Sequence, residues 1–140
     1  NFSSGLSGYR LWLEREPTIR LNIILDLTRK IKQEYPHLKI RLDTDGLAQL
    51  RSSDREVARE LKDAGIDSVS ISLNAEDEEK YEELCNPSLL GAYQAVLDFA
   101  KDCKKHFLHV RLTVVNIEKI DIIKCRRIAE SLGCDFKVRG

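Results

Sequence analysis

Helical and strand patterns alternate along this 140-residue chain from residue 19 to its C-terminal end. The spacing of apolar residues and the positions of helix-capping residues predict helices at residues 19–35, 53–64, 74–86, 88–106 and 121–132. Short strand patterns lie between them, at residues 38–44, 67–73, 107–115 and 134–139. Strands separated by helices pair in parallel through right-handed crossovers, so the sequence predicts a parallel sheet built from βα repeats.

Local signals set the expected helix ends. Ser53 and Glu56 have the spacing of a capping box, which predicts the start of the second helix. Asn74 and Ser88 are expected to cap the two helices that follow. Gly65 stands where a helix is expected to end, because glycine adopts the left-handed conformation without strain.

Each predicted strand has one apolar face and one polar face. In the third strand pattern, Val110, Leu112 and Val114 alternate with polar residues, which are His109, Arg111 and Thr113. Parallel strands covered by helices on both sides are apolar throughout, and burying charged groups in a core is costly. The sequence therefore predicts an α/β fold that is a partial (β/α) barrel of the TIM type, with helices on one face and a polar concave face.

We expect one domain over residues 1–140, with an N-terminal loop remnant at 1–18 and βα repeats at 19–140. A chain of this length buries roughly 70% of its unfolded surface, which is enough for a core. The chain begins with Asn1 and contains no methionine, so we expect it to be a piece of a longer protein.

Charge and hydropathy narrow the expected partners. The chain has 23 basic and 23 acidic residues and a formal net charge of zero, so no general attraction to nucleic acid or membrane lipid is expected. No apolar run approaches the roughly 18 residues of a membrane span, and the opening residues are not those of a signal peptide. We therefore expect a cytoplasmic protein. Its cysteines are expected to be reduced thiols rather than metal ligands, because no CxxC pair links them: Cys85, Cys103, Cys125 and Cys134.

Polar residues gather where the predicted strands end, which is where sites form in barrels of this kind. They lie at residues 43–46, 70–74, 113–116 and 137–139. Carboxylate, hydroxyl and amide groups suit ribose hydroxyls, whereas Arg41, Arg111, Lys137 and Arg139 suit a carboxylate or phosphate. Asp45, Asn74 and Asn116 also have the character of turn and cap residues, and that interpretation stays open.

Several segments together resemble one family. They are residues 1–5 (NFSSG), 9–12, 16–18 (EPT), 43–47 (DTDGL), 68–75 (SVSISLNA) and the pattern within 121–133. Through nearly all of its length the chain resembles the radical S-adenosylmethionine (radical SAM) proteins that are found linked to TatD-type hydrolases. The resemblance implies an enzyme that binds a [4Fe–4S] cluster and cleaves S-adenosylmethionine to a 5′-deoxyadenosyl radical, which acts on an unknown substrate.

The sequence departs from that family in two places. The CxxxCxxC loop that binds the cluster is not in the sequence, and Glu16-Pro17 runs directly into Thr18 without the helix, strand and glycine-rich GEP that similar proteins carry. We therefore expect an incomplete radical SAM domain that holds no cluster. Neither a catalytic residue nor a metal ligand is assigned to it.

The resemblance implies two groups of binding residues. The cofactor side comprises Glu16, Thr44, Asp45, Gly46, Ser70, Ser72, Asn74 and Asn116. The substrate side comprises Arg41, Arg111 and Arg139. The expected partners are a small molecule or unknown substrate and, through the family, a TatD-type hydrolase.

Two other functions stay open. One is a non-catalytic barrel remnant that acts as a scaffold or binding module. The other is a metal-free barrel lyase that uses Lys137 or Asp43. In all three cases a sheet without its first strand exposes an unpaired edge, which predicts a dimer formed through that edge.

Overall fold

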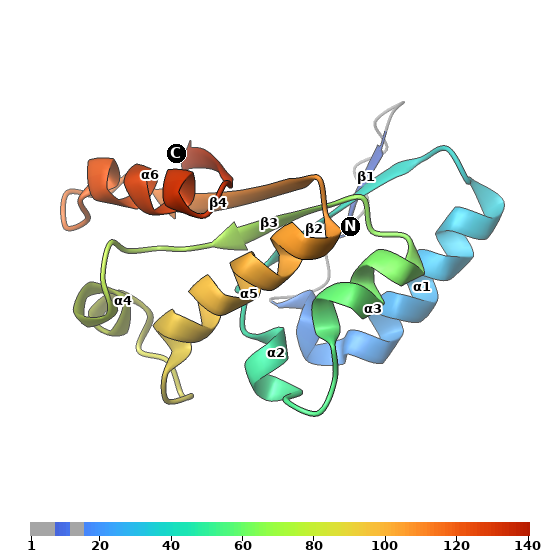
Figure 1. The fold of residues 1–140 in the computed structure, drawn as a ribbon, viewed down its shortest axis with the longest axis horizontal. Coiled ribbons are helices and arrows are strands. Elements are labelled where there is room, and N and C mark those ends of the chain that lie inside the picture. Colours follow the sequence, from blue (N-terminus) through green and yellow to red (C-terminus); the bar gives the residue numbers. More distant parts are fainter. Residues whose placement is uncertain (1–7, 12–15) are drawn as a thin grey trace.

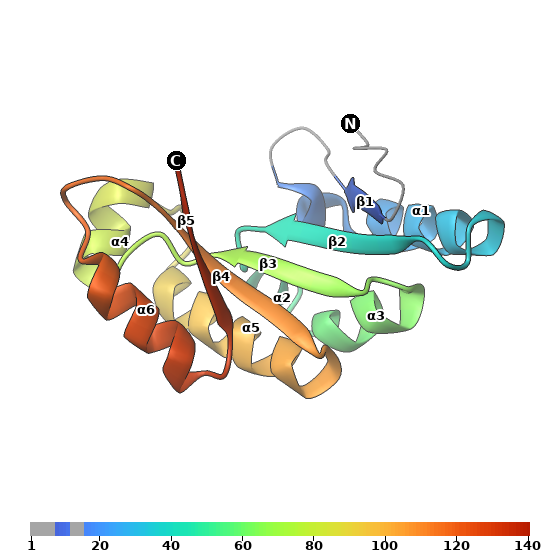
Figure 2. The ribbon, with the colours of Figure 1, turned by 90° about the horizontal axis from the view of Figure 1, so that it is seen from above.

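The computed structural model describes residues 8–11 and 16–140, and their core is a five-stranded parallel sheet. The strands are β1 (Gly8–Leu11), β2 (Lys39–Thr44), β3 (Ser68–Ser72), β4 (His109–Val115) and β5 (Asp135–Arg139). They lie side by side in chain order, and every neighbouring pair is parallel (Figure 2). The predicted α/β fold with parallel strands is confirmed. Residues 8–11, which were expected in a loop, instead form β1.

Helices fill the connections between the strands. They are the 3₁₀ turn η1 (Pro17–Arg20), α1 (Leu21–Glu34), α2 (Ala48–Arg51), α3 (Val57–Ala64), α4 (Glu78–Cys85), α5 (Ala92–His106) and α6 (Ile122–Ser131). Helix α3 packs between α1 and α5, and α6 packs on β4 and β5. Figure 1 shows the helices gathered on one side of the sheet, as the two-faced strands predict.

The core lies between the sheet and this helical layer. The inward strand residues Ile40, Leu42, Ile71 and Leu112 are fully buried. They belong to one cluster with helix residues that include Ile24, Leu61, Val96 and Phe99. The opposite strand face stays half-exposed at Arg41, Asp43, Ser72 and Arg111. An open polar face of this kind is what a partial barrel leaves on its concave side.

The capping predictions were wrong at three helix starts. Glu56 precedes α3 without a side-chain cap, and the Val57 amide instead donates to Oε1 of Gln49 at 3.1 Å. Helix α4 is capped by Asp77 rather than Asn74, and Gly91 rather than Ser88 precedes α5. At α3 and α4 another side chain accepts from the free amides of the first helical turn, whereas α5 begins without a side-chain cap.

The expected helix ends hold. Gly65 follows α3 with φ = +121°, and Gly133 follows the last turn of α6 with φ = +73°.

Among the described residues, no helix is both long enough and apolar enough to cross a membrane.

Candidate functional site

The carboxyl ends of β2, β3 and β4 meet along one border of the sheet, here called the carboxyl edge. The register pairs Thr44 with Ile71 and Ser72 with Thr113. Asn116 joins the same border because its amide donates to the carbonyl of Arg139 at 3.0 Å. Most of the cofactor-side residues named from the sequence therefore lie along one line.

The turn that follows β2 consists of Thr44, Asp45 and Gly46 and is called the β2 turn below. The Gly46 amide donates to the Thr44 hydroxyl at 3.1 Å, and the Leu47 amide donates to Asp45 Oδ1 at 3.0 Å. Gly46 has φ = +80°, a backbone conformation that favours glycine. The side chains of Thr44 and Asp45 therefore stabilise the β2 turn from within.

Glu16 reaches this turn from the segment before η1. Its Oε2 accepts hydrogen bonds from the Thr18 amide at 2.9 Å, from the Thr18 hydroxyl, and from the Thr44 hydroxyl at 2.8 Å. Its Oε1 accepts from the Asp45 amide at 2.6 Å. Burial raises the pKa of the Glu16 carboxyl, and the nearby Asp45 carboxylate raises it further. The structure thus brings Glu16 next to Thr44 and Asp45, as expected for one site. The contacts of Glu16 are hydrogen bonds within the protein.

Arg51 is a charged residue of the site that the sequence analysis missed. It lies in α2 and pairs with Asp45, with Nη2 2.5 Å from Oδ2 and Nη1 3.3 Å from Oδ1. Helix α2 has only four residues, too few to produce a detectable pattern. The one available signal was the six-residue spacing from Asp45, which lets an arginine in the following turn reach back.

At the end of β3, the two groups of residues named from the sequence contact each other. The Arg111 Nε donates to the Ser70 hydroxyl at 3.3 Å, and Arg139 Nη2 lies 3.5 Å from the Ser72 hydroxyl. Ser70 and Arg111 are also partners in the register of the sheet. The expected cofactor-side serines and substrate-side arginines therefore form one continuous polar strip on the concave face.

The remaining residues named from the sequence lie apart from this strip. Arg41 pairs with Asp43 at 2.9 Å, one step back from the carboxyl edge. Asn74 has φ = +70°, and its side-chain amide donates to the Cys85 sulfur at 3.4 Å. Asn74 thus acts as the strand-end turn residue that was left open as an alternative.

The described residues do not fit an iron–sulfur cluster. Cluster binding needs several thiolates around one centre, and no group of three or more metal-ligating side chains gathers anywhere in the described ranges. Burial raises the pKa of all four thiols, that of Cys125 to about 11, which opposes thiolate formation. No chemical step is therefore assigned to these cysteines.

The described residues fit S-adenosylmethionine better than they fit an iron–sulfur cluster. Hydroxyl and amide groups at the ends of β3 and β4 suit the hydroxyls of a ribose. They are the Ser72 hydroxyl and the side-chain amides of Asn74 and Asn116, although the Asn74 nitrogen already donates to Cys85. The Ser70 hydroxyl is buried and accepts from Arg111.

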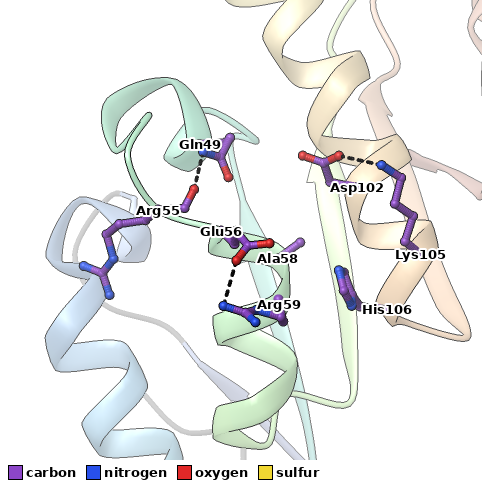
Figure 3. Close-up of a pocket in the computed structure, with 8 residues that line it drawn as sticks. All are labelled: Gln49, Arg55, Glu56, Ala58, Arg59, Asp102, Lys105 and His106. Atoms are coloured by element: carbon purple, nitrogen blue, oxygen red, sulfur yellow. Dashed lines mark hydrogen bonds and ion pairs between the residues drawn. The ribbon is translucent and has the colours of Figure 1, made fainter.

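A separate pocket lies among the helices. It has a volume of about 450 Å³ and is lined by α2, the start of α3 and the end of α5 (Figure 3). Its acidic groups are paired with neighbouring bases, Glu56 with Arg59 at 2.7 Å and Asp102 with Lys105 at 3.5 Å. Because these charges are already paired, the pocket is a weaker candidate for a ligand-binding site than the carboxyl edge.

Residues 5–124 match the Radical SAM superfamily. Because this match covers most of the chain, the protein belongs to the radical SAM superfamily. It is 30% identical over 120 residues to a GTP 3',8-cyclase from Lactiplantibacillus plantarum, an alignment that covers 84% of this chain and 33% of the relative. It is 29% identical over 126 residues to a GTP 3',8-cyclase from Corynebacterium glutamicum, covering 87% and 32%. The chain thus spans about a third of the length of these curated relatives.

Proposed function

We propose that this chain provides the S-adenosylmethionine-binding carboxyl edge of a radical SAM enzyme. Membership of the superfamily carries this proposal. The polar strand ends support it independently, because parallel α/β sheets bind ligands outside the carboxyl ends of their strands. When bound together with its cluster, the cofactor supplies a 5′-deoxyadenosyl radical that abstracts hydrogen from a substrate.

The residues of this chain would bind and orient the cofactor. Ser72 lies at the end of β3, where its hydroxyl would contact one ribose hydroxyl. The side-chain oxygen of Asn74 would accept from the ribose, while its nitrogen keeps the hydrogen bond to Cys85. Asn116 follows β4 and would lie toward the adenine. The β2 turn would face the amino-acid end, with the Asp45 carboxylate held in place by Arg51. No described residue takes a proton or an electron in this scheme.

For the substrate, we propose an anionic small molecule. Arg111 and Arg139 lie on the concave face beside the proposed ribose contacts, and guanidinium groups bind phosphates and carboxylates well. The relatives are named for GTP, which makes a nucleoside triphosphate one candidate of this class. The TatD-linked subgroup that the sequence resembles is the alternative, with an unknown substrate and a functional link to a TatD-type hydrolase.

A titration with S-adenosylhomocysteine, a stable analogue that lacks the cleavable sulfonium, tests the cofactor site. We expect the chain to bind it, and we expect Ser72→Ala to weaken binding roughly two- to tenfold, the effect of one lost hydrogen bond. Ser68→Ala is the matched control, because Ser68 is a half-buried serine on the same face of β3, at its amino end. Calorimetry that finds equal losses for both variants, or no binding to the unmodified chain, contradicts the proposal.

A further inference from the structure

We propose that Glu16 is a positioning residue that fixes the β2 turn, rather than a direct contact to the cofactor. This inference deepens the proposed function, and it rests on that function only because the β2 turn belongs to the proposed cofactor-binding edge. The family resemblance implies that the Glu16 side chain contacts the cofactor, and the inference replaces that role.

The Glu16 carboxylate joins two segments that are far apart in the sequence. It caps η1 through the Thr18 amide and hydroxyl, on the N-terminal side of α1. It also accepts from Thr44 and from the backbone of Asp45, which lie 28 and 29 residues further along the chain. A carboxylate that only capped η1 would need neither of the last two contacts.

Most of the acceptor capacity of this carboxylate serves contacts within the protein. Oε2 accepts three hydrogen bonds and Oε1 accepts one, whereas each carboxylate oxygen offers about two lone-pair positions. Only Oε1 keeps a position for an ammonium group of a ligand, and that oxygen already accepts from the Asp45 amide at 2.6 Å. These internal contacts favour a positioning role for Glu16 over a direct contact to the cofactor.

The hydrogen bonds of Glu16 continue into the β2 turn. The Thr44 hydroxyl gives its single proton to Glu16 and accepts from the Gly46 amide, so it has one defined orientation. The Asp45 amide is fixed by Glu16, while the Asp45 carboxylate accepts from Leu47 and pairs with Arg51. Glu16 thus orients the Thr44 hydroxyl and holds the backbone amide of Asp45.

Amide hydrogen exchange on the ligand-free, 140-residue chain tests this role residue by residue. In Glu16→Gln, one carbonyl oxygen remains to accept from Thr18 and Thr44, but an NH₂ group faces the Asp45 amide. We expect the Asp45 amide to exchange roughly tenfold faster or more, because it loses a charged acceptor, while the Thr18 amide keeps its protection. Amides in the middle of β3 report on global stability and are expected to change little.

Two further variants sharpen the result. Glu16→Asp keeps a good helix cap for η1 but is one methylene too short to span to the β2 turn, so it should free the Asp45 amide and leave η1 intact. This variant decides the question if Glu16→Gln does not fold. Asp121→Asn is the matched control, since Asp121 caps α6 through the Lys124 amide, within its own helix. It should leave the β2 turn unchanged.

Unchanged protection of Asp45 in both Glu16 variants overturns the inference. So does a uniform loss of protection across the chain, because that is the mark of a general loss of stability. Since no ligand is present, the outcome is independent of the S-adenosylhomocysteine titration, and either proposal can fail without the other.

Discussion

Two separate constraints favour glycine at position 46: a positive backbone φ and the lack of space for a Cβ atom in the core. The backbone has φ = +80°, and a Cβ added there would lie 2.8 Å from Cγ2 of Ile71 and 3.3 Å from Cγ1 of Val96. We expect Gly46→Ala to lower the free energy of unfolding by about 2–4 kcal/mol, because it combines left-handed strain with overpacking of the core. Urea denaturation of the variant measures this loss.

Gly91 separates the two causes. It has a similar φ of +70°, but an added Cβ would meet nothing within 4 Å. Gly91→Ala should therefore show only the backbone strain, about 1–2 kcal/mol. Equal losses for the two variants would mean that the close approach of Gly46 to Ile71 contributes nothing.

Single residues of the site were easier to predict than their contacts. Asp45 and Gly46 stand out in the sequence as a strand-end turn, and the structure places them in one. The junction with Glu16 could not be read in the same way, because it depends on how η1 folds back over the end of β2. Nor could the sequence show that Arg51 pairs with Asp45, because the six-residue spacing permits this ion pair but is equally compatible with a solvated arginine.

Among the elements, α1 and the starts of β2 and β3 share one half-buried polar junction. Lys32 Nζ donates to the Leu38 carbonyl and to Asp67 Oδ2, both at 2.7 Å. The same Asp67 oxygen accepts from the Ile40 amide at 2.8 Å. We expect Asp67→Ala to lower the free energy of unfolding by about 1–3 kcal/mol, because the Ile40 amide loses its acceptor and Lys32 keeps only the Leu38 carbonyl. Chemical denaturation checks this value.

Asp26 provides the comparison for Asp67. It pairs with Arg29 at 3.0 Å on the exposed side of α1, where both side chains are more than half accessible. Solvent screens such pairs, so Asp26→Ala should change stability little. A loss as large as that of Asp67→Ala would show that the effect is not specific to the junction.

The sequence predicted the existence of the longer elements well and their starts less well. Helices α1, α5 and α6 have strong apolar periodicity and lie close to their expected positions. The capping box at Ser53 failed because Gln49, from the undetected helix α2, caps α3 instead. Strand β1 has four residues, and its pairing with β2 is a long-range contact that leaves little local signal.

For the whole molecule, we propose that an open sheet edge mediates a dimer. In the described chain, β1 and β5 each pair with only one neighbour. Unpaired strand edges present free amides and carbonyls to another chain. Sedimentation velocity should therefore show a concentration-dependent dimer, and a monomer throughout the micromolar range would contradict the proposal.

The overall architecture followed from the two faces of the strands. His109, Arg111 and Thr113 could not all point into a helix-covered core, and that conflict predicted helices on one side only. Burial does not follow the pattern completely, since Ser70 and Thr113 are nearly inaccessible on the polar face. The exposed fraction of these side chains depends on the curvature of the sheet and on neighbouring arginine side chains. A strand pattern contains no information about either.

The order of the strands has a consequence for how the chain folds. Because β1 to β5 pair in the order in which they occur in the sequence, each βα unit contacts chiefly the units next to it. Such a chain behaves in part like a repeat protein, whose stability is a sum of nearest-neighbour contributions. Each new unit can dock on the one synthesised just before it, so the segment to be closed is the single helical connection between two consecutive strands. The terminal strands then open first, and the central strand β3, which lies farthest from both edges, opens last.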